Sequence, residues 1–319
     1  MSYIFNDQTH GAEITHLFPD RVQGKTFILA GLKRGALAAA TADALAAAGA
    51  GVIICTGHCQ KELQPVIDHI HRKYRNVKMV FITADTSSIS SFQEAGHTVK
   101  RMGVPINGFI GFPSVMAVEW EKTRDGFESH FQRNYLCYFL FIKLISDCMA
   151  PRSRVVLVTS SVRTDVRAPT WVDIGFSNGE DYHCLDGYSQ ASLANILFAK
   201  SLSNIYRDRS IAAFSANPGN TKTNIQTYVT KDQINTWLER KKIAGEEIPM
   251  FLQQAPKSLA QGSAIVLRGL LDPGLEDQPG AFLNDCQVHN LPHLDFPAGE
   301  ESAMTLWRRS EEYLEAFLC

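Results

Sequence analysis

Short apolar runs alternate with longer amphipathic stretches along most of the chain, beginning at Lys25. The apolar runs predict strands at residues 26–30, 51–55, 78–82, 108–112, 154–159 and 211–216. Helical periodicity predicts helices at about 36–48, 60–74, 87–101, 124–149 and 187–206. Strands that alternate with helices of crossover length are typical of a parallel sheet. We therefore predict one Rossmann-type, doubly wound α/β domain over residues 1–319, with helices on both faces of the sheet.

Two segments, residues 163–185 and 223–257, break this rhythm. Both follow the carboxyl ends of predicted strands, which is the edge where open α/β sheets bind ligands. Aromatic residues gather in both segments: Trp171, Phe176, Tyr182, Tyr228, Trp237 and Phe251. We interpret the segments as a substrate loop and a lid, although the same aromatic residues could simply pack connecting loops against the sheet.

Composition narrows the class of partner. The 319 residues are 45% hydrophobic and 20% charged, with a formal net charge of -2 and no long block of either sign. Nucleic acid and membranes are therefore not expected as partners, and a small-molecule substrate is. The most apolar stretch, residues 136–142, is followed by Lys143 and Asp147 and is too short to span a bilayer. Residues 1–24 contain no apolar leader, so we expect a soluble, cytoplasmic protein.

The seven cysteines are scattered along the chain and form no C-x-x-C pair. Cys55 and Cys59 bracket the end of the second predicted strand, but no His/Cys cluster with zinc spacing accompanies them. We therefore expect reduced thiols and no metal site.

The first predicted strand leads into a loop that contains Gly31 and Gly35, with Lys33 and Arg34 between them. Glycines at such a turn let the backbone approach a phosphate at the N-terminus of the following helix. Only these two glycines are present, so the loop could bind a dinucleotide or be an ordinary strand-to-helix turn. Likewise, the two basic side chains could face a phosphate or solvent.

Hydroxyl and amide residues recur in a characteristic order at the predicted strand ends. The order is Asn134, serines at the end of the fifth strand, Tyr188, and the Asn-Pro-Gly turn at 217–219. Through these positions the chain resembles the short-chain dehydrogenase/reductase superfamily, particularly its retinol-dehydrogenase-like branch, which has many fungal secondary-metabolism members. The resembling segments cover nearly the whole chain: residues 122–134, 154–161, 188–190, 193–195, 217–219, 261–273 and 280–286.

The resemblance implies a catalytic set of Asn, Ser, Tyr and Lys. It assigns the first three roles to Asn134, Ser161 and Tyr188, but the lysine position holds Ser192. A free tyrosine has a pKa near ~10, so without a neighbouring cation only about one phenol in a thousand is ionised at pH 7. Alcohol oxidation, which needs a base, should suffer most, whereas reactions that need a protonated phenol survive. Lys33 or Lys222 could supply a cation from another loop.

The resemblance also implies an NADP(H) site, whose residues have drifted from the family pattern. The family's threonine before the first glycine is Ala30, its Asn-Asn-Ala-Gly segment is 111–114, and its phosphate-binding arginine is His58. The basic loop favours NADP(H) over NAD(H), if the cofactor is still bound. The implied cofactor-binding residues are Gly31, Lys33, Arg34, Gly35, His58, Asp85, Pro218, Gly219 and Thr223.

These observations support three hypotheses about the function. The first is a tailoring enzyme on a carbonyl-bearing small metabolite, with Tyr188 as acid and weakened or absent hydride transfer, as in an isomerisation or cyclisation. The second is an NADP(H)-dependent carbonyl reductase or alcohol dehydrogenase, and the third is a non-catalytic binding protein. We interpret His97, His130 and His183 as surface or packing residues. The helices at 124–149 and 187–206 resemble those that pair subunits in this superfamily, so a homodimer is possible, although their apolar faces could equally be covered inside a monomer.

Overall fold

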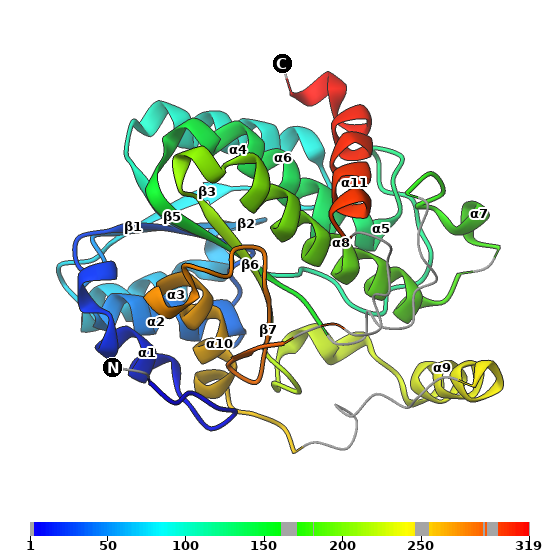
Figure 1. The fold of residues 1–319 in the computed structure, drawn as a ribbon, viewed down its shortest axis with the longest axis horizontal. Coiled ribbons are helices and arrows are strands. Elements are labelled where there is room, and N and C mark those ends of the chain that lie inside the picture. The colour runs from blue at the N-terminus through cyan, green and yellow to red at the C-terminus, as the bar shows by residue number, and fades with distance from the viewer. Residues whose placement is uncertain are drawn as a thin grey trace.

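A computed structural model of the chain describes residues 3–160, 171–180, 182–245, 255–289, 291 and 299–318. Within these residues an eight-stranded sheet has the order β3-β2-β1-β4-β5-β6-β7-β8 (Figure 1). All neighbours are parallel except β7 and β8. The order reverses direction beside β1, so the predicted doubly wound fold is confirmed. The strands are β1 (Thr26–Ala30), β2 (Val52–Gly57), β3 (Lys78–Thr83), β4 (Ile106–Gly111), β5 (Met149–Val158), β6 (Ala212–Asn217), β7 (Phe282–Asn284) and β8 (Gln287–Val288).

Helices cover both faces of this sheet, and each face has its own hydrophobic core (Figure 1). One face carries α1 (Gly11–Leu17), α2 (Leu37–Ala47), α3 (Gln60–Lys73) and α10 (Leu259–Leu271). The other carries α4 (Ile89–Met102), α6 (Cys137–Ile145), α8 (Cys184–Ile205) and α11 (Gly299–Tyr313). The short α5 (Ser129–Phe131) and α7 (Phe176–Gly179) and the outlying α9 (Lys231–Ala244) complete the described helices. The central strands are therefore buried on both sides, as their continuous apolar runs predict.

The segment predicted as one helix at 124–149 is divided in the structure. The helical part begins at Ser129, because the Glu128 carboxylate accepts the backbone N–H groups of His130 and Phe131 as an N-terminal cap. A π-helical turn, Gln132–Leu136, interrupts it before α6, and β5 already begins at Met149. The predicted boundaries were thus wrong at both ends, since apolar periodicity registers neither a capping carboxylate nor a π-turn.

The C-terminal helix α11 lies on α6 and α8, on the apolar face that suggested a homodimer (Figure 1). Trp307 packs edge-on against Phe139, with ring centroids 4.9 Å apart. Polar contacts fasten the same helix, because Ser310 lies 2.7 Å from the Tyr135 hydroxyl and Glu311 pairs with Lys143 at 2.8 Å. This face is therefore covered within one chain, and the homodimer stays a prediction.

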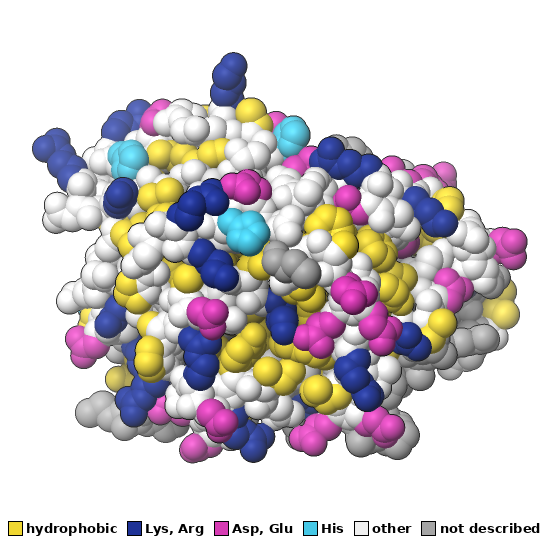
Figure 2. Space-filling model, turned by 90° about the horizontal axis from the view of Figure 1, so that it is seen from above, with side chains coloured by type: hydrophobic (Ala, Val, Ile, Leu, Met, Phe, Trp, Pro, Cys, Tyr) yellow, Lys and Arg dark blue, Asp and Glu magenta, His cyan; other side chains and the backbone are white. Residues whose placement is uncertain are grey.

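On the face that Figure 2 presents, Lys, Arg, Asp and Glu side chains are interspersed among the described residues. None of the helices in the described part of the chain is both long and apolar enough to cross a membrane. The described residues also contain no group of three or more His, Cys, Asp or Glu side chains placed to hold a metal ion.

Candidate active site

A cavity of about 400 Å³ opens at the carboxyl edge of the sheet, between the ends of β1, β4, β5 and β6. Its size lies within the usual range for small-molecule sites. The Thr159 hydroxyl donates a hydrogen bond to the Ser192 carbonyl oxygen at 2.8 Å and so ties the end of β5 to α8. As a result, Ser160 and Tyr188 both line the cavity. The sheet thus brings the predicted tyrosine to a ligand-sized space.

Tyr188 is a buried ionisable residue in the wall of this cavity. Its side chain is buried, with 6% relative exposure, and it forms a side-chain hydrogen bond with Ser160. Burial raises the pKa of Tyr188 to about 12, although the hydrogen bonds with Ser160 and Ser192 act in the opposite direction. The phenol therefore stays protonated through the neutral range, and it can donate a proton or a hydrogen bond to a ligand oxygen.

Ser160, one residue before the predicted Ser161, is one of the hydroxyl partners of Tyr188 among the described residues. Ser161 itself lies outside the described residues. The predicted role of Ser161 therefore stays a prediction.

Ser192, in the lysine position, does not line the described cavity. Its side chain is buried, and its hydroxyl donates to the Tyr188 carbonyl oxygen at 2.9 Å, one helical turn back. It cannot supply a positive charge. Both lysines considered as substitutes, Lys33 and Lys222, are exposed, and of the two only Lys33 lines the described cavity.

Asn134 is held firmly at the π-helical turn. Its side-chain oxygen accepts the backbone N–H groups of Ser114 and Val115, and its amide donates to the Val115 carbonyl at 2.8 Å. The backbone carbonyl of Asn134 accepts the Asn195 amide at 3.0 Å. Asn134 therefore fixes the loop after β4 against α8, and π-turns often occur at functional sites for this kind of positioning.

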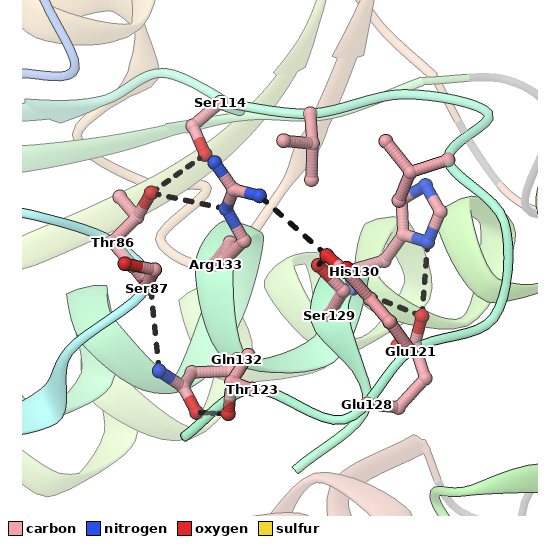
Figure 3. A network of polar contacts seen from close by, with 12 residues as sticks. Thr86, Ser87, Ser114, Glu121, Thr123, Glu128, Ser129, His130, Gln132 and Arg133 are labelled. Carbon is pink, nitrogen blue, oxygen red and sulfur yellow. Dashed lines mark hydrogen bonds and ion pairs between the residues drawn. The ribbon is translucent and has the colours of Figure 1, made fainter. Parts of the chain in front are cut away.

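A buried polar cluster behind Tyr188 was missed in the sequence. Glu128 and His130 are buried, and Glu128 Oε1 lies 3.0 Å from His130 Nδ1 (Figure 3). The Tyr182 hydroxyl is 2.9 Å from the same ring nitrogen. The His130 ring also packs edge-on against Tyr188, with centroids 6.1 Å apart, while its Nε2 has no hydrogen-bond partner within the described residues. His130 is thus part of the Tyr188 environment and not only a packing residue.

Gly187 makes this cluster possible. A Cβ atom at this position would lie 2.8 Å from the Tyr182 hydroxyl and 3.1 Å from Glu128 Oε1. The first turns of α8 can therefore approach the cluster closely only because the residue before Tyr188 has no side chain. A glycine directly before the tyrosine is the one signal that could have pointed to a tightly packed neighbour.

The glycine loop retains one feature of a cofactor turn. Gly31 has φ +90°, and a Cβ there would lie 2.8 Å from the Phe112 carbonyl oxygen, so the ends of β1 and β4 meet closely at this glycine. Lys33 Nζ donates to the Ser114 carbonyl at 3.0 Å and links the same two loops. Burial, together with the nearby charge of Arg133, lowers the pKa of Lys33. Gly31 and Lys33 line the cavity, whereas Arg34 is exposed and Gly35 does not line it.

The predicted adenine end lies apart from this cavity. His58 Nδ1 is 3.7 Å from the Asp85 carboxylate, and Arg124 reaches the same carboxylate at 3.4 Å. Partial burial would raise the pKa of Asp85, but hydrogen bonds from Ser87 and the charges of His58 and Arg124 hold it below its ordinary value. Neither His58 nor Asp85 lines the described cavity. Asp85 is therefore engaged in ion pairs with His58 and Arg124, and its contact with an adenine stays a prediction.

A network of polar groups separates the two ends. Thr86 shares a 3.0 Å hydrogen bond with the Ser114 hydroxyl and accepts from Arg133 Nε at 3.4 Å (Figure 3). With the Lys33 contact to Ser114, this network joins the loops after β1, β3 and β4 to the π-turn.

The turn after β6 fits the nicotinamide end of a dinucleotide. Pro218, Gly219 and Thr223 all line the cavity. The Gly219 N–H donates to the Asn217 side chain at 3.1 Å, and Lys257, paired with Asp285, lies beneath the same turn. The residues that line the described cavity therefore fit the nicotinamide half of an NADP(H) molecule.

The two predicted ligand loops are described only in part. Trp171 is buried beside Phe131 and accepts the Tyr313 hydroxyl at its carbonyl oxygen, so it packs the loop against α11. Tyr182 joins the cluster around His130, and Trp237 on α9 is buried. Phe251 and the side chain of Tyr228 lie outside the described residues. The interpretation as substrate loop and lid remains a prediction.

The chain is similar in sequence to proteins of one known family. A family model described as short chain dehydrogenase matches residues 25–234. The chain is 26% identical over 308 residues to the WW domain-containing oxidoreductase of Homo sapiens, covering 92% of this chain and 68% of the relative. It is 26% identical over 313 residues to the short-chain dehydrogenase/reductase prx1 of Penicillium roqueforti, covering 92% and 86%.

Among solved structures, a short chain dehydrogenase of Burkholderia cenocepacia in complex with NADP aligns with a TM-score of 0.60 at 20% identity, covering 82% of this chain and 96% of that one. Such a likeness concerns the fold. Together with the family match over most of the sheet, it accounts for the strand order, the glycine turn and the position of Tyr188. The chain belongs to the short-chain dehydrogenase family.

Proposed function

We propose that the protein is a tailoring enzyme that acts on a carbonyl-bearing small molecule, with Tyr188 as the acid and with little or no net hydride transfer. Ser160 orients the substrate oxygen, and Asn134 and the His130 cluster hold the surrounding elements in place. The reaction class is an isomerisation or a cyclisation, in which polarising the carbonyl is the main requirement.

One observation carries the proposal. A buried, protonated Tyr188 is hydrogen-bonded to Ser160 in a ligand-sized cavity, while the position of the family's cation holds a serine whose hydroxyl is engaged with the backbone. A phenol with a pKa of about 12 is a poor base but remains a competent hydrogen-bond donor. The hydrogen-bond donors to a substrate oxygen, Tyr188 and Ser160, are thus retained. The cation that would assist alcohol oxidation is replaced by Ser192.

The test is the substitution Tyr188→Phe, which removes the donor and keeps the ring. We expect turnover of the wild type's substrate to fall by about 10²-fold or more, the usual range for loss of a general acid. Tyr206→Phe, at the far end of α8, is the matched control and should leave turnover unchanged. Undiminished turnover in Tyr188→Phe would overturn the proposal.

The second candidate is an NADP(H)-dependent carbonyl reductase. It is favoured by Lys33 in the cavity wall and by the names of the relatives, which are oxidoreductases. It predicts carbonyl-dependent consumption of NADPH, increased by Ser192→Lys. The third candidate, a non-catalytic binding protein, predicts that removal of both Tyr188 and Ser160 leaves the biological output unchanged.

A further inference from the structure

A second cavity, of about 290 Å³, lies between α9 and the body of the protein. It shares three lining residues with the Tyr188 cavity, namely Met116, Asn220 and Gln226. The two spaces therefore adjoin, and a ligand longer than the first cavity can extend into the second. The function proposed above uses only the first cavity.

The walls of the second cavity are apolar. Beyond the shared residues, the described lining consists of Leu185, Val229, Ile234 and Trp237, none of which is ionisable. The amides of Asn220 and Gln226 lie where the two cavities meet. A charged group in such a space would lose its hydration without gaining an opposite charge from these residues, which is costly. An uncharged apolar group would be favoured.

The helix α9, which forms one wall of this cavity, is packed against the rest of the protein. Trp237 is 2% exposed and belongs to a small hydrophobic cluster with Leu185, separate from the two main cores. Lys241 Nζ lies 4.3 Å from the centre of the Trp237 ring. Arg240 pairs with Asp186 of α8 at 3.1 Å. Apolar and ionic contacts thus hold α9 at a fixed distance from α8 and keep the cavity open.

We propose that the second cavity is a subsite for an uncharged hydrocarbon or aromatic arm of the substrate, whose carbonyl lies at Tyr188. The substrate class is therefore a lipophilic aldehyde or ketone with an apolar arm several carbons long. The position of the carbonyl rests on the proposed function, but binding of the arm requires no reaction.

The test measures binding of a homologous series of methyl ketones, from hexanone to dodecanone, to the whole protein by calorimetry. Each methylene that enters an apolar space contributes about 0.8 kcal/mol, so the affinity should rise about fourfold per carbon until the cavity is filled. Ile234→Phe adds volume to the cavity wall and should stop this rise at a shorter chain. Val229→Leu is a more conservative substitution, used in case Ile234→Phe does not fold. It should also stop the rise in affinity at a shorter chain. Ile243→Phe is the matched control, because Ile243 lies on the same helix and is 88% exposed.

An affinity that does not depend on chain length would overturn the subsite, as would an equal effect of Ile243→Phe and Ile234→Phe. The experiments distinguish failure of the subsite from failure of the proposed function. If chain-length dependence holds but turnover is insensitive to Tyr188→Phe, the subsite stands and the catalytic proposal fails. If turnover depends on Tyr188 while affinity ignores chain length, the catalytic proposal stands and the subsite fails.

Discussion

Replacing Ser192 by lysine tests the electrostatic account of Tyr188 directly. With a pKa of about 12, about one Tyr188 phenol in 10⁵ is ionised at pH 7, and forming the phenolate at that pH costs about 7 kcal/mol. Residues four apart on a helix lie about 5–6 Å apart at Cβ. An opposite charge at such a distance lowers a pKa by about 1–3 units. In Ser192→Lys the pKa of Tyr188 should therefore fall to about 9–11, and the ionised fraction at pH 7 should rise by about 10- to 1,000-fold.

The assay is an alkaline titration that follows phenolate absorbance, with the same titration of a Tyr188→Phe variant subtracted. The wild type should show no Tyr188 transition below about pH 10, because burial has moved the pKa upward. Ile205→Lys places the same charge on an exposed position at the other end of α8 and should change nothing. A wild-type transition below pH 10, or an unchanged transition in Ser192→Lys, would refute the reasoning.

Four further predictions follow from the same contacts. Ser160→Ala should reduce turnover by about 10²-fold, whereas Ser161→Ala should not; the reverse result would favour the sequence-based assignment of Ser161. His130→Leu removes the imidazole that hydrogen-bonds with the buried Glu128 carboxylate and should lower the free energy of unfolding in urea by about 1–3 kcal/mol, an unchanged free energy being incompatible with such a contact. Lys33→Met should weaken NADPH binding by about tenfold or more in calorimetry and leave NADH binding unchanged, and equal effects on both would exclude a phosphate role. Turnover of the wild type that depends on Tyr188 as acid should be flat from neutral pH to about pH 10, because the phenol loses its proton only near its raised pKa; an alkaline decline centred near pH 8 would point to another group.

The sheet could be predicted because its signals are local. The run of residues 26–30 is bounded by Lys25 and Gly31, and β1 has these same limits. The order of chemical residues at the strand ends placed Tyr188 correctly at the carboxyl edge, because parallel strands present those ends together. The short antiparallel pair β7 and β8 was not predicted, since strands of three and two residues carry too few positions for an alternating pattern.

The remainder of the site depended on contacts between distant segments. His130 carries no sequence signal of its own, and only the approach of Tyr182 and α8 makes it a neighbour of Tyr188. The hydrogen bond between Ser160 and Tyr188 depends on how the end of β5 lies against α8, which the Thr159 hydrogen bond to the Ser192 carbonyl fixes. The occupation of Asp85 by His58 and Arg124 depends on three separate loops. Such contacts are fixed by tertiary packing, which local propensity does not encode.

The central claim is that Tyr188 acts as an acid without net hydride transfer. The most direct measurement incubates the wild type and Tyr188→Phe with lipophilic aldehydes and ketones in the presence of NADPH, and follows product by mass spectrometry together with NADPH absorbance. We expect product of unchanged mass, or of mass reduced by water, to form only with the wild type and without NADPH consumption. Product that gains two hydrogens in step with NADPH oxidation, or equal product from Tyr188→Phe, would contradict the claim.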